Sequence, residues 1–254
     1  MRSPIIAAAL LCVLLAAAHA GDGQTARERT WAALPNWSGI WLSDDGIQTR
    51  VGLGNDPDGP GPTDRILGAH LPYNQQWEAR FQDMHSAPAE PPVGKSCVWY
   101  FPGVMEGPKV FEALITPEET ALIFEAGEIR HILTDGRLHP APQDRWPTPW
   151  GDSIGHWDGG TLVIDTVAVA KDPTPFSPLV SDSAHFTERI RLVGKDRLED
   201  RLTVTDPVAL ARPWTVTLPY RRVTAQDRIV HGDCAQNDRN PIVDGKLLIT
   251  PPQR

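Results

Sequence analysis

Short apolar runs separated by turn residues dominate the chain after residue 109. The runs are rich in Val, Ile, Thr and Phe, and clusters of Gly, Asp, Asn and Pro separate them. Strands joined by turns have this pattern, whereas helices need longer segments with apolar residues three or four positions apart. The pattern predicts strands over residues 37–43, 110–116, 120–126, 128–134, 153–157, 161–169, 185–193, 197–205 and 214–223, with a less regular run at 228–231.

One segment before most of these strands has helical periodicity instead. Within residues 73–85, the apolar side chains of Trp77, Phe81 and Met84 follow one another at spacings of four and three residues. This spacing places all three on one face of a helix, and Pro72 just before the segment is typical of a helix start. We therefore expect a helix over 73–85 that packs by this face outside the sheet or across one end of it.

Three connections between the expected strands have the chemistry of tight hairpins. They lie at residues 125–128, 157–160 and 193–196, and each contains glycine. Strands joined mostly by such turns form an antiparallel meander, whose free edges disappear when the sheet closes into a barrel. Gly39 and Trp41 in the first strand are similar to the opening of lipocalin-like barrels. We expect an all-β, antiparallel, lipocalin-like (calycin-type) barrel of about eight to ten strands with one accessory helix, with a β-sandwich as the alternative.

The first 20 residues have the pattern of a secretion signal. Arg2 precedes an apolar run over residues 5–18, and the small-x-small sequence of residues 18–20 comes directly before a polar stretch. This run is shorter than a membrane-spanning helix and lacks a basic flank on its far side. We expect a signal peptide over 1–20, a polar arm over 21–36 with a helical turn, and one barrel domain over 37–254. The expected location is periplasmic or secreted.

Composition and charge exclude several classes of protein. Hydrophobic residues make up 41% of the chain and charged residues 22%, which is typical of a folded domain. The net charge is −8 and Lys and Arg are scattered, so there is no basic stripe that would bind nucleic acid. No segment after residue 20 is apolar for long enough to predict a membrane span in the mature chain.

Four segments carry a resemblance to a known family. Residues 37–41 read WSGIW, residues 130–140 read RHILTDGRLHP, residues 153–166 read SIGHWDGGTLVIDT and residues 188–191 read ERIR. In these segments the chain resembles an uncharacterised family of secreted bacterial proteins, and the likeness spans most of residues 37–240. The resemblance implies secretion but no activity. The chain departs from the expected pattern after Cys97, where residues 98–103 read VWYFPG instead of a plainer Pro-rich turn.

Several titratable residues alternate with aliphatic residues in the expected strands. Successive side chains of a strand point to opposite faces, so a residue two positions from an aliphatic one shares its face. By this rule we expect inward-facing side chains at His131, His156, Asp165, Glu188 and Asp200. A buried charge needs a partner, and a paired imidazole and carboxylate are suited to general acid–base catalysis. A buried structural network is the alternative. The predicted catalytic residues are His131, His156, Glu188 and Asp165.

A second set of residues is suited to binding a small acid. The guanidinium groups of Arg130 and Arg137 can bind a carboxylate, and Trp99 and Trp157 can stack on an apolar or aromatic group. His139 precedes a proline in an expected loop and is placed to line the mouth of a barrel. These five residues are the predicted substrate-binding residues.

Two functions therefore remain open at this point. The first is a periplasmic, cofactor-independent acid–base enzyme, of lyase, isomerase or hydrolase type, that acts on a small apolar or aromatic acid. The second is a lipocalin-like protein that binds such a ligand without changing it. No cofactor is expected, and no metal, because no two histidines have the His-x-His or His-x-x-x-His spacing of metal ligands. The sequence leaves the substrate and the oligomeric state open.

Removal of the expected signal peptide leaves two cysteines, Cys97 and Cys234, in an exported chain. We predict that they form one structural disulfide, because thiols pair in oxidising compartments and neither has a neighbouring cysteine for metal or redox chemistry. Intact-mass spectrometry of the mature protein with and without reductant tests this prediction. If both thiols of unreduced, denatured protein react with an alkylating agent, the disulfide does not exist.

Overall fold

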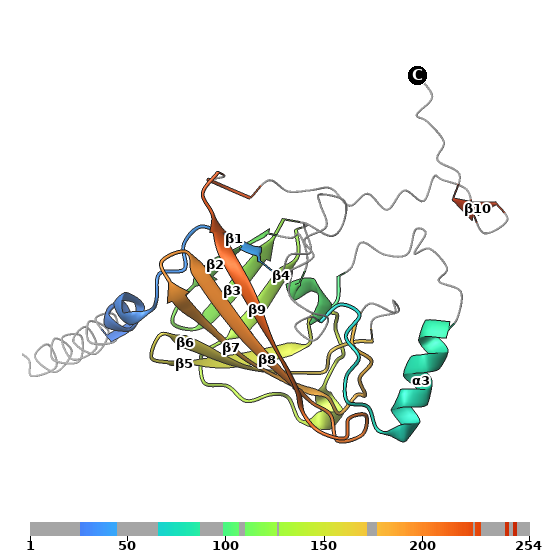
Figure 1. The fold of residues 1–254 in the computed structure, drawn as a ribbon. Helices are drawn as coiled ribbons and strands as arrows, with labels where there is room; N and C mark the ends of the chain where they lie inside the picture. Colours follow the sequence, from blue (N-terminus) through green and yellow to red (C-terminus); the bar gives the residue numbers. More distant parts are fainter. Residues whose placement is uncertain are drawn as a thin grey trace, which may run out of the picture.

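Nine strands form a closed barrel in the computed structural model (Figure 1). The structure describes residues 26–44, 66–86, 99–106, 110–125, 127–171, 177–225, 227–229, 242–243 and 246–247. The strands of the barrel are β1 (Ile40–Ser43), β2 (Val110–Ile115), β3 (Glu119–Phe124), β4 (Ile129–Leu133), β5 (Asp152–Asp158), β6 (Thr161–Val167), β7 (His185–Gly194), β8 (Arg197–Thr205) and β9 (Trp214–Val223). The expected all-β barrel is therefore confirmed.

The barrel closes where its first strand meets its last. Strand β1 pairs antiparallel with β2 on one side and with β9 on the other, so that Trp41 lies opposite both Phe111 and Arg222. The guanidinium of Arg222 stacks on the ring of Trp41, with the carbon Cζ 4.2 Å from the ring centroid. With both edges of the meander paired, the barrel presents no open strand edge along its circumference.

One pair of neighbouring strands differs from the expected antiparallel meander. Strands β4 and β5 pair parallel, with Leu133 opposite Ile154, whereas every other pair of neighbouring barrel strands is antiparallel. A tight hairpin cannot join parallel strands, because the chain must return to the end from which it started. The long connection over residues 134–151, which includes a short 3-10 helix at Pro142–Asp144, makes this return.

Side chains fill the interior of the barrel. Phe111, Phe124, Phe186, Leu218 and Tyr220 are each at most 3% exposed and belong to one hydrophobic cluster. The ring of Phe111 packs on Phe124 and, edge to face, on Tyr220. These side chains form the packed core of the barrel.

The accessory helix α3 spans Gln75–Ser86 and lies to one side of the barrel, as expected (Figure 1). Asn74 caps its first turn, because the side-chain oxygen Oδ1 accepts a hydrogen bond from the backbone of Trp77 at 3.1 Å. The amide nitrogen of Asn74 donates to the backbone oxygen of Val208, which ties the start of the helix to the loop before β9. Trp77 is buried and Phe81 packs against the core cluster, so the predicted apolar face is the packed one.

Other expectations fall at the margins of the described chain. Residues 26–33 of the expected polar arm are helical and lie on the opposite side of the barrel from α3 (Figure 1). Two short strands, β10 (Ile242–Val243) and β11 (Lys246–Leu247), pair antiparallel. Residues 228 and 229 are not in a strand. Cys97 and Cys234 lie outside the described residues, so their disulfide stays a prediction. Within the described chain, no helix has the length and apolar character needed to cross a bilayer.

Gly151 holds the end of the β4–β5 connection close to β6. Its φ is +71°, and a Cβ added there would lie 2.6 Å from the backbone oxygen of Val167. Gly136 has a similar φ of +83° but no atom within 4 Å of such a Cβ. We predict that Gly151→Ala lowers the free energy of unfolding by about 1–3 kcal/mol more than Gly136→Ala, because only the first adds a clash to the backbone strain. Urea denaturation measures the free energy of unfolding of both variants. Equal losses of stability would show that β6 can move away from the added methyl group without cost.

Candidate functional site

Two of the predicted site residues meet inside the barrel. Arg130 of β4 and Glu188 of β7 form two parallel hydrogen bonds, from Nη1 to Oε1 at 2.8 Å and from Nη2 to Oε2 at 2.5 Å. Both side chains are 0% exposed. The inward orientation expected of Glu188 is confirmed. The guanidinium that was predicted to hold a substrate carboxylate already holds a carboxylate of the protein itself.

Polar and aromatic groups surround the remaining faces of Arg130. Its Nη2 also donates to the hydroxyls of Ser153 at 3.3 Å and Thr166 at 3.1 Å, and these two hydroxyls hydrogen-bond each other at 2.8 Å. The ring of Phe101 covers the guanidinium, with Cζ 4.2 Å from the ring centroid. All these contacts lie in the packed interior, and the binding role predicted for Arg130 stays a prediction.

Asp200 of β8 completes this buried charge cluster and is also 0% exposed, as expected. Burial raises the pKa of Asp200 well above its ordinary value, and the negative charge of Glu188 raises it further, against the opposing effect of Arg130. A hydrogen bond with Glu188 also favours the protonated form. Within the described chain, no N–H or O–H group donates to either oxygen of Asp200, so Arg130 alone favours its ionised form. Asp200 therefore adds a second buried carboxyl group beside the pair of Arg130 and Glu188.

Three predicted catalytic residues lie on the outside of the barrel. The side chain of His131 is 63% exposed and pairs with Glu119 of the neighbouring strand. His156 is exposed, and the carboxylate of Asp165 is 40% exposed. The inward orientation expected of these three residues is wrong. Their catalytic roles stay predictions, on the outer surface and not in a barrel cavity.

The orientation of these three side chains was predicted wrongly because aliphatic residues occupy both faces of β4, β5 and β6. In β4, Arg130 and Ile132 are both 0% exposed, so they face the core and His131 faces solvent. In β5, Ser153 is buried and Trp157 packs against the core cluster, which places His156 outside. In β6 the inward positions begin at Leu162, and every second residue after it is buried. The alternation of residues makes either face of these strands apolar enough to point into the barrel. The side chains that meet inside the barrel determine which face does so.

Asp165 and His139 meet on this outer surface, in a row of four side chains. Nδ1 of His139 bonds to Oδ1 of Asp152, and its Nε2 lies 3.3 Å from Oδ2 of Asp165 without hydrogen-bond alignment. The other oxygen of Asp165 lies 3.6 Å from Nδ1 of His185. His139 is only 10% exposed in its side chain, whereas the other three are 35–47% exposed. Asp152, His139, Asp165 and His185 are called the His–Asp row below.

The remaining predicted binding residues do not gather at one place. Arg137 pairs with Asp135 in the exposed turn after β4, and the hydrogen bond from Arg137 lowers the pKa of Asp135 to about 2. Trp157 packs edge to face on Trp37 in the core, with ring centroids 5.3 Å apart. Trp99 is 47% exposed. The predicted substrate-binding set therefore splits between the core, an exposed turn and the surface.

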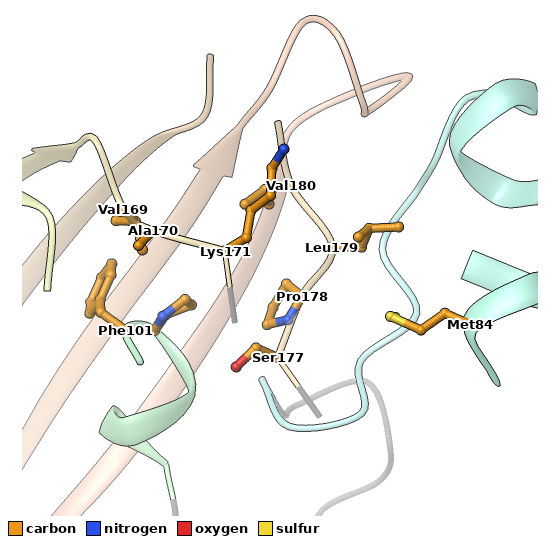
Figure 2. Close-up of a pocket in the computed structure, with 10 residues that line it drawn as sticks. Met84, Phe101, Val169, Ala170, Lys171, Ser177, Pro178, Leu179 and Val180 are labelled. Atoms are coloured by element: carbon orange, nitrogen blue, oxygen red, sulfur yellow. The ribbon is translucent and has the colours of Figure 1, made fainter. Parts of the chain in front are cut away.

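A pocket of about 130 Å³ lies beside the barrel, where sequence reasoning placed no site (Figure 2). Its lining is mostly apolar and comes from Phe101 and Pro102, from residues 169–171 after β6, from residues 177–180 and from Met84 of α3. Figure 2 shows residues 177–179 passing between Phe101 and Met84. Among the described residues that line the pocket, Lys171 is the only charged one. The sequence signal for this pocket was weak, since its walls are short loop segments without periodicity.

Hydrogen bonds fix the loop that forms one wall of the pocket. The hydroxyl of Tyr73 accepts a hydrogen bond from the backbone of Leu179 at 3.0 Å, and burial raises the pKa of Tyr73 to about 12. Both oxygens of Asp206 accept from Ser181, one from the backbone nitrogen at 2.6 Å and one from the hydroxyl at 2.8 Å. These hydrogen bonds attach Leu179 to Tyr73 and Ser181 to Asp206, so two positions of this loop are fixed to the rest of the fold.

Neither the search for metal ligands nor the comparison with known proteins assigns a function to these residues. Among the described residues, no group of three or more His, Cys, Asp or Glu side chains is placed to hold a metal ion, because the His–Asp row does not converge on one point. Comparison of the chain with family models, curated proteins and solved structures found no match. The function therefore has to be argued from the site itself.

The buried charge cluster makes stability depend on pH. The pKa of Asp200 is raised in the folded protein from an ordinary 3.8, so the folded state keeps a proton that the unfolded chain loses. We predict that stability is greatest below about pH 4 with respect to this group and falls as pH rises toward the folded pKa, by up to about 1.4 kcal/mol per pH unit. Asp200→Asn keeps a neutral hydrogen-bond donor at this position and removes this decrease of stability with rising pH.

Urea unfolding of wild type and Asp200→Asn over a range of pH measures the difference between the two slopes. Asp182→Asn is the matched control, because the side chain of Asp182 is 85% exposed and the chemical change is the same. Identical pH dependence in wild type and Asp200→Asn would mean that Asp200 is ionised in the folded protein.

Proposed function

We propose that the protein is an exported, lipocalin-like protein that binds a small apolar or aromatic acid in the pocket of Figure 2. The observation that supports this function is a formed apolar pocket with one cation in its lining and no predicted catalytic residue among its walls. An acid–base enzyme with His131, His156 and Glu188 would need them together on an open cavity. Two of them are on the outer surface and the third is sealed inside.

The size of the pocket limits the ligand. An apolar cavity of about 150 Å³ holds one benzene ring, so a pocket of about 130 Å³ accommodates a single ring or a short aliphatic chain. Phe101, Leu179 and Val180 are among the apolar residues of its lining (Figure 2). A larger ligand would have to extend out of the pocket into solvent.

Lys171 supports an acid as the ligand. Its side chain is 68% exposed, and its Nζ lies 3.7 Å from Oδ1 of Asp182, whose side chain is 85% exposed. An exposed pair at this distance contributes little, so Lys171 can exchange Asp182 for a ligand carboxylate at small cost. The apolar part of the ligand would supply most of the affinity and the lysine would supply the preference for an acid.

The His–Asp row supports acid–base catalysis as a second candidate function. His139 lies between the carboxylates of Asp152 and Asp165 and is only 10% exposed. A carboxylate partner fixes the tautomer and orientation of an imidazole, which prepares it to take or give a proton. Any substrate of this site would lie against the outer surface of β5, β6 and β7, because Asp152, Asp165 and His185 belong to these three strands and His139 to the β4–β5 connection.

Ligand-observed NMR with benzoate, phenylacetate and hexanoate, and with benzyl alcohol as the uncharged probe, tests the binding function. We expect millimolar or tighter binding of at least one acid by wild type, and its loss in Val180→Trp, which fills the pocket. Val208→Trp adds the same ring at an exposed position outside the pocket and keeps the binding. Lys171→Gln weakens the acid by up to about five-fold without changing the alcohol, whereas Lys195→Gln changes neither.

Absence of binding for all three acids, or binding by Val180→Trp equal to wild type, would contradict the proposed pocket. The same samples in D₂O test the second candidate. Exchange of ligand C–H hydrogens, or a new product, in wild type and in His70→Gln but not in His139→Gln would make the protein an enzyme that uses the His–Asp row, since His70 is 55% exposed and belongs to neither candidate site.

A further inference from the structure

Three arginines gather on the outer surface of the barrel, away from the pocket and the buried charge cluster. Arg189 and Arg191 of β7 and Arg201 of β8 line a hollow of about 160 Å³ together with Thr161 and Glu199. The strand register brings them together, because Arg189 lies directly opposite Arg201, and Arg191 lies opposite both Thr161 and Glu199. These five residues are called the arginine patch.

The charges in the arginine patch are not balanced. Nη2 of Arg189 bonds to Asp158 at 3.0 Å, and Nη2 of Arg191 bonds to Glu199 at 3.1 Å. The guanidinium of Arg201 has no hydrogen bond or ion pair within the described part of the chain. Like charges placed directly opposite each other on two strands repel, so Arg189 and Arg201 destabilise the β7–β8 pair unless an anion lies between them.

We propose that the arginine patch binds the phosphate group of a small molecule. Guanidinium groups donate parallel pairs of hydrogen bonds to oxyanions, and a tetrahedral dianion can accept from Arg189, Arg191 and Arg201 at once, whereas one carboxylate has only two oxygens. The hydroxyl of Thr161 adds another donor at the edge of the hollow.

The surrounding charge favours a small ligand over a polymer. The patch holds three arginines against Glu199 and the neighbouring Asp158, while the chain as a whole carries a net charge of −8. A nucleic acid or another long polyanion would extend beyond the patch onto a negatively charged protein. A hollow of about 160 Å³ has room for a phosphate and a few atoms of its substituent. This site is independent of the proposed function in the pocket.

NMR of the arginine Nε–H groups during titration with inorganic phosphate at constant ionic strength tests the site. We expect saturable shifts at Arg189, Arg191 and Arg201 in the millimolar range of phosphate. Arg201→Gln weakens phosphate binding at least five-fold. Arg197→Gln is the matched control, because Arg197 lies on the same face of β8 but is paired with Asp44 at 2.9 Å, and it retains wild-type binding.

A parallel titration with glucose 6-phosphate distinguishes the form of the ligand. Tighter binding than inorganic phosphate means that the hollow also contacts the substituent, and equal binding means that the patch recognises the anion alone. Both results support the site. Linear shifts without saturation, or equal weakening by Arg201→Gln and Arg197→Gln, would show only general attraction between charges and would overturn the proposal.

Discussion

The buried ion pair between Arg130 and Glu188 is the interaction on which the arrangement of the barrel depends. It joins β4 to β7 through the interior, and Ser153, Thr166 and Asp200 extend the contacts to β5, β6 and β8. Leaving one partner of such a pair alone in a core costs about 3–5 kcal/mol. A slip of one residue in β4 would move Arg130 to the outside and leave Glu188 unpaired, so the pair favours a single register.

The sequence predicted the elements well because their signals are local. Hairpins with glycine, such as the turn at Gly159, and short aliphatic runs need no knowledge of distant partners, and the helix of Trp77 and Phe81 follows from spacing alone. The direction of side chains in β4 and β6 depends instead on which residues meet inside the barrel. Glu188 and Asp200 were placed correctly because each lies between residues that are clearly apolar, whereas His131 competes with Arg130 for the inner face.

The candidate site was harder to predict because it is built from loops. The pocket combines Phe101, Lys171 and Leu179 from segments that no periodic pattern connects. In the His–Asp row, His139 reaches Asp152 from the long connection that the parallel β4–β5 pair requires. Asp152 and His185 did have a weak signal, since both begin a strand at the same end of the sheet. Only the register of β5, β6 and β7 shows that they flank Asp165.

The pairing of β1 with β9 has a consequence for how the chain folds. Ile40 of β1 pairs with Val223 of β9, so the barrel cannot close until both its first and its last strand have been made. Contacts between residues so distant in sequence slow folding, because the entropy of ordering the intervening chain is lost before the contact forms. During synthesis, one edge of β1 therefore stays open, and the growing chain is exposed to strand-mediated association until residue 223 has emerged.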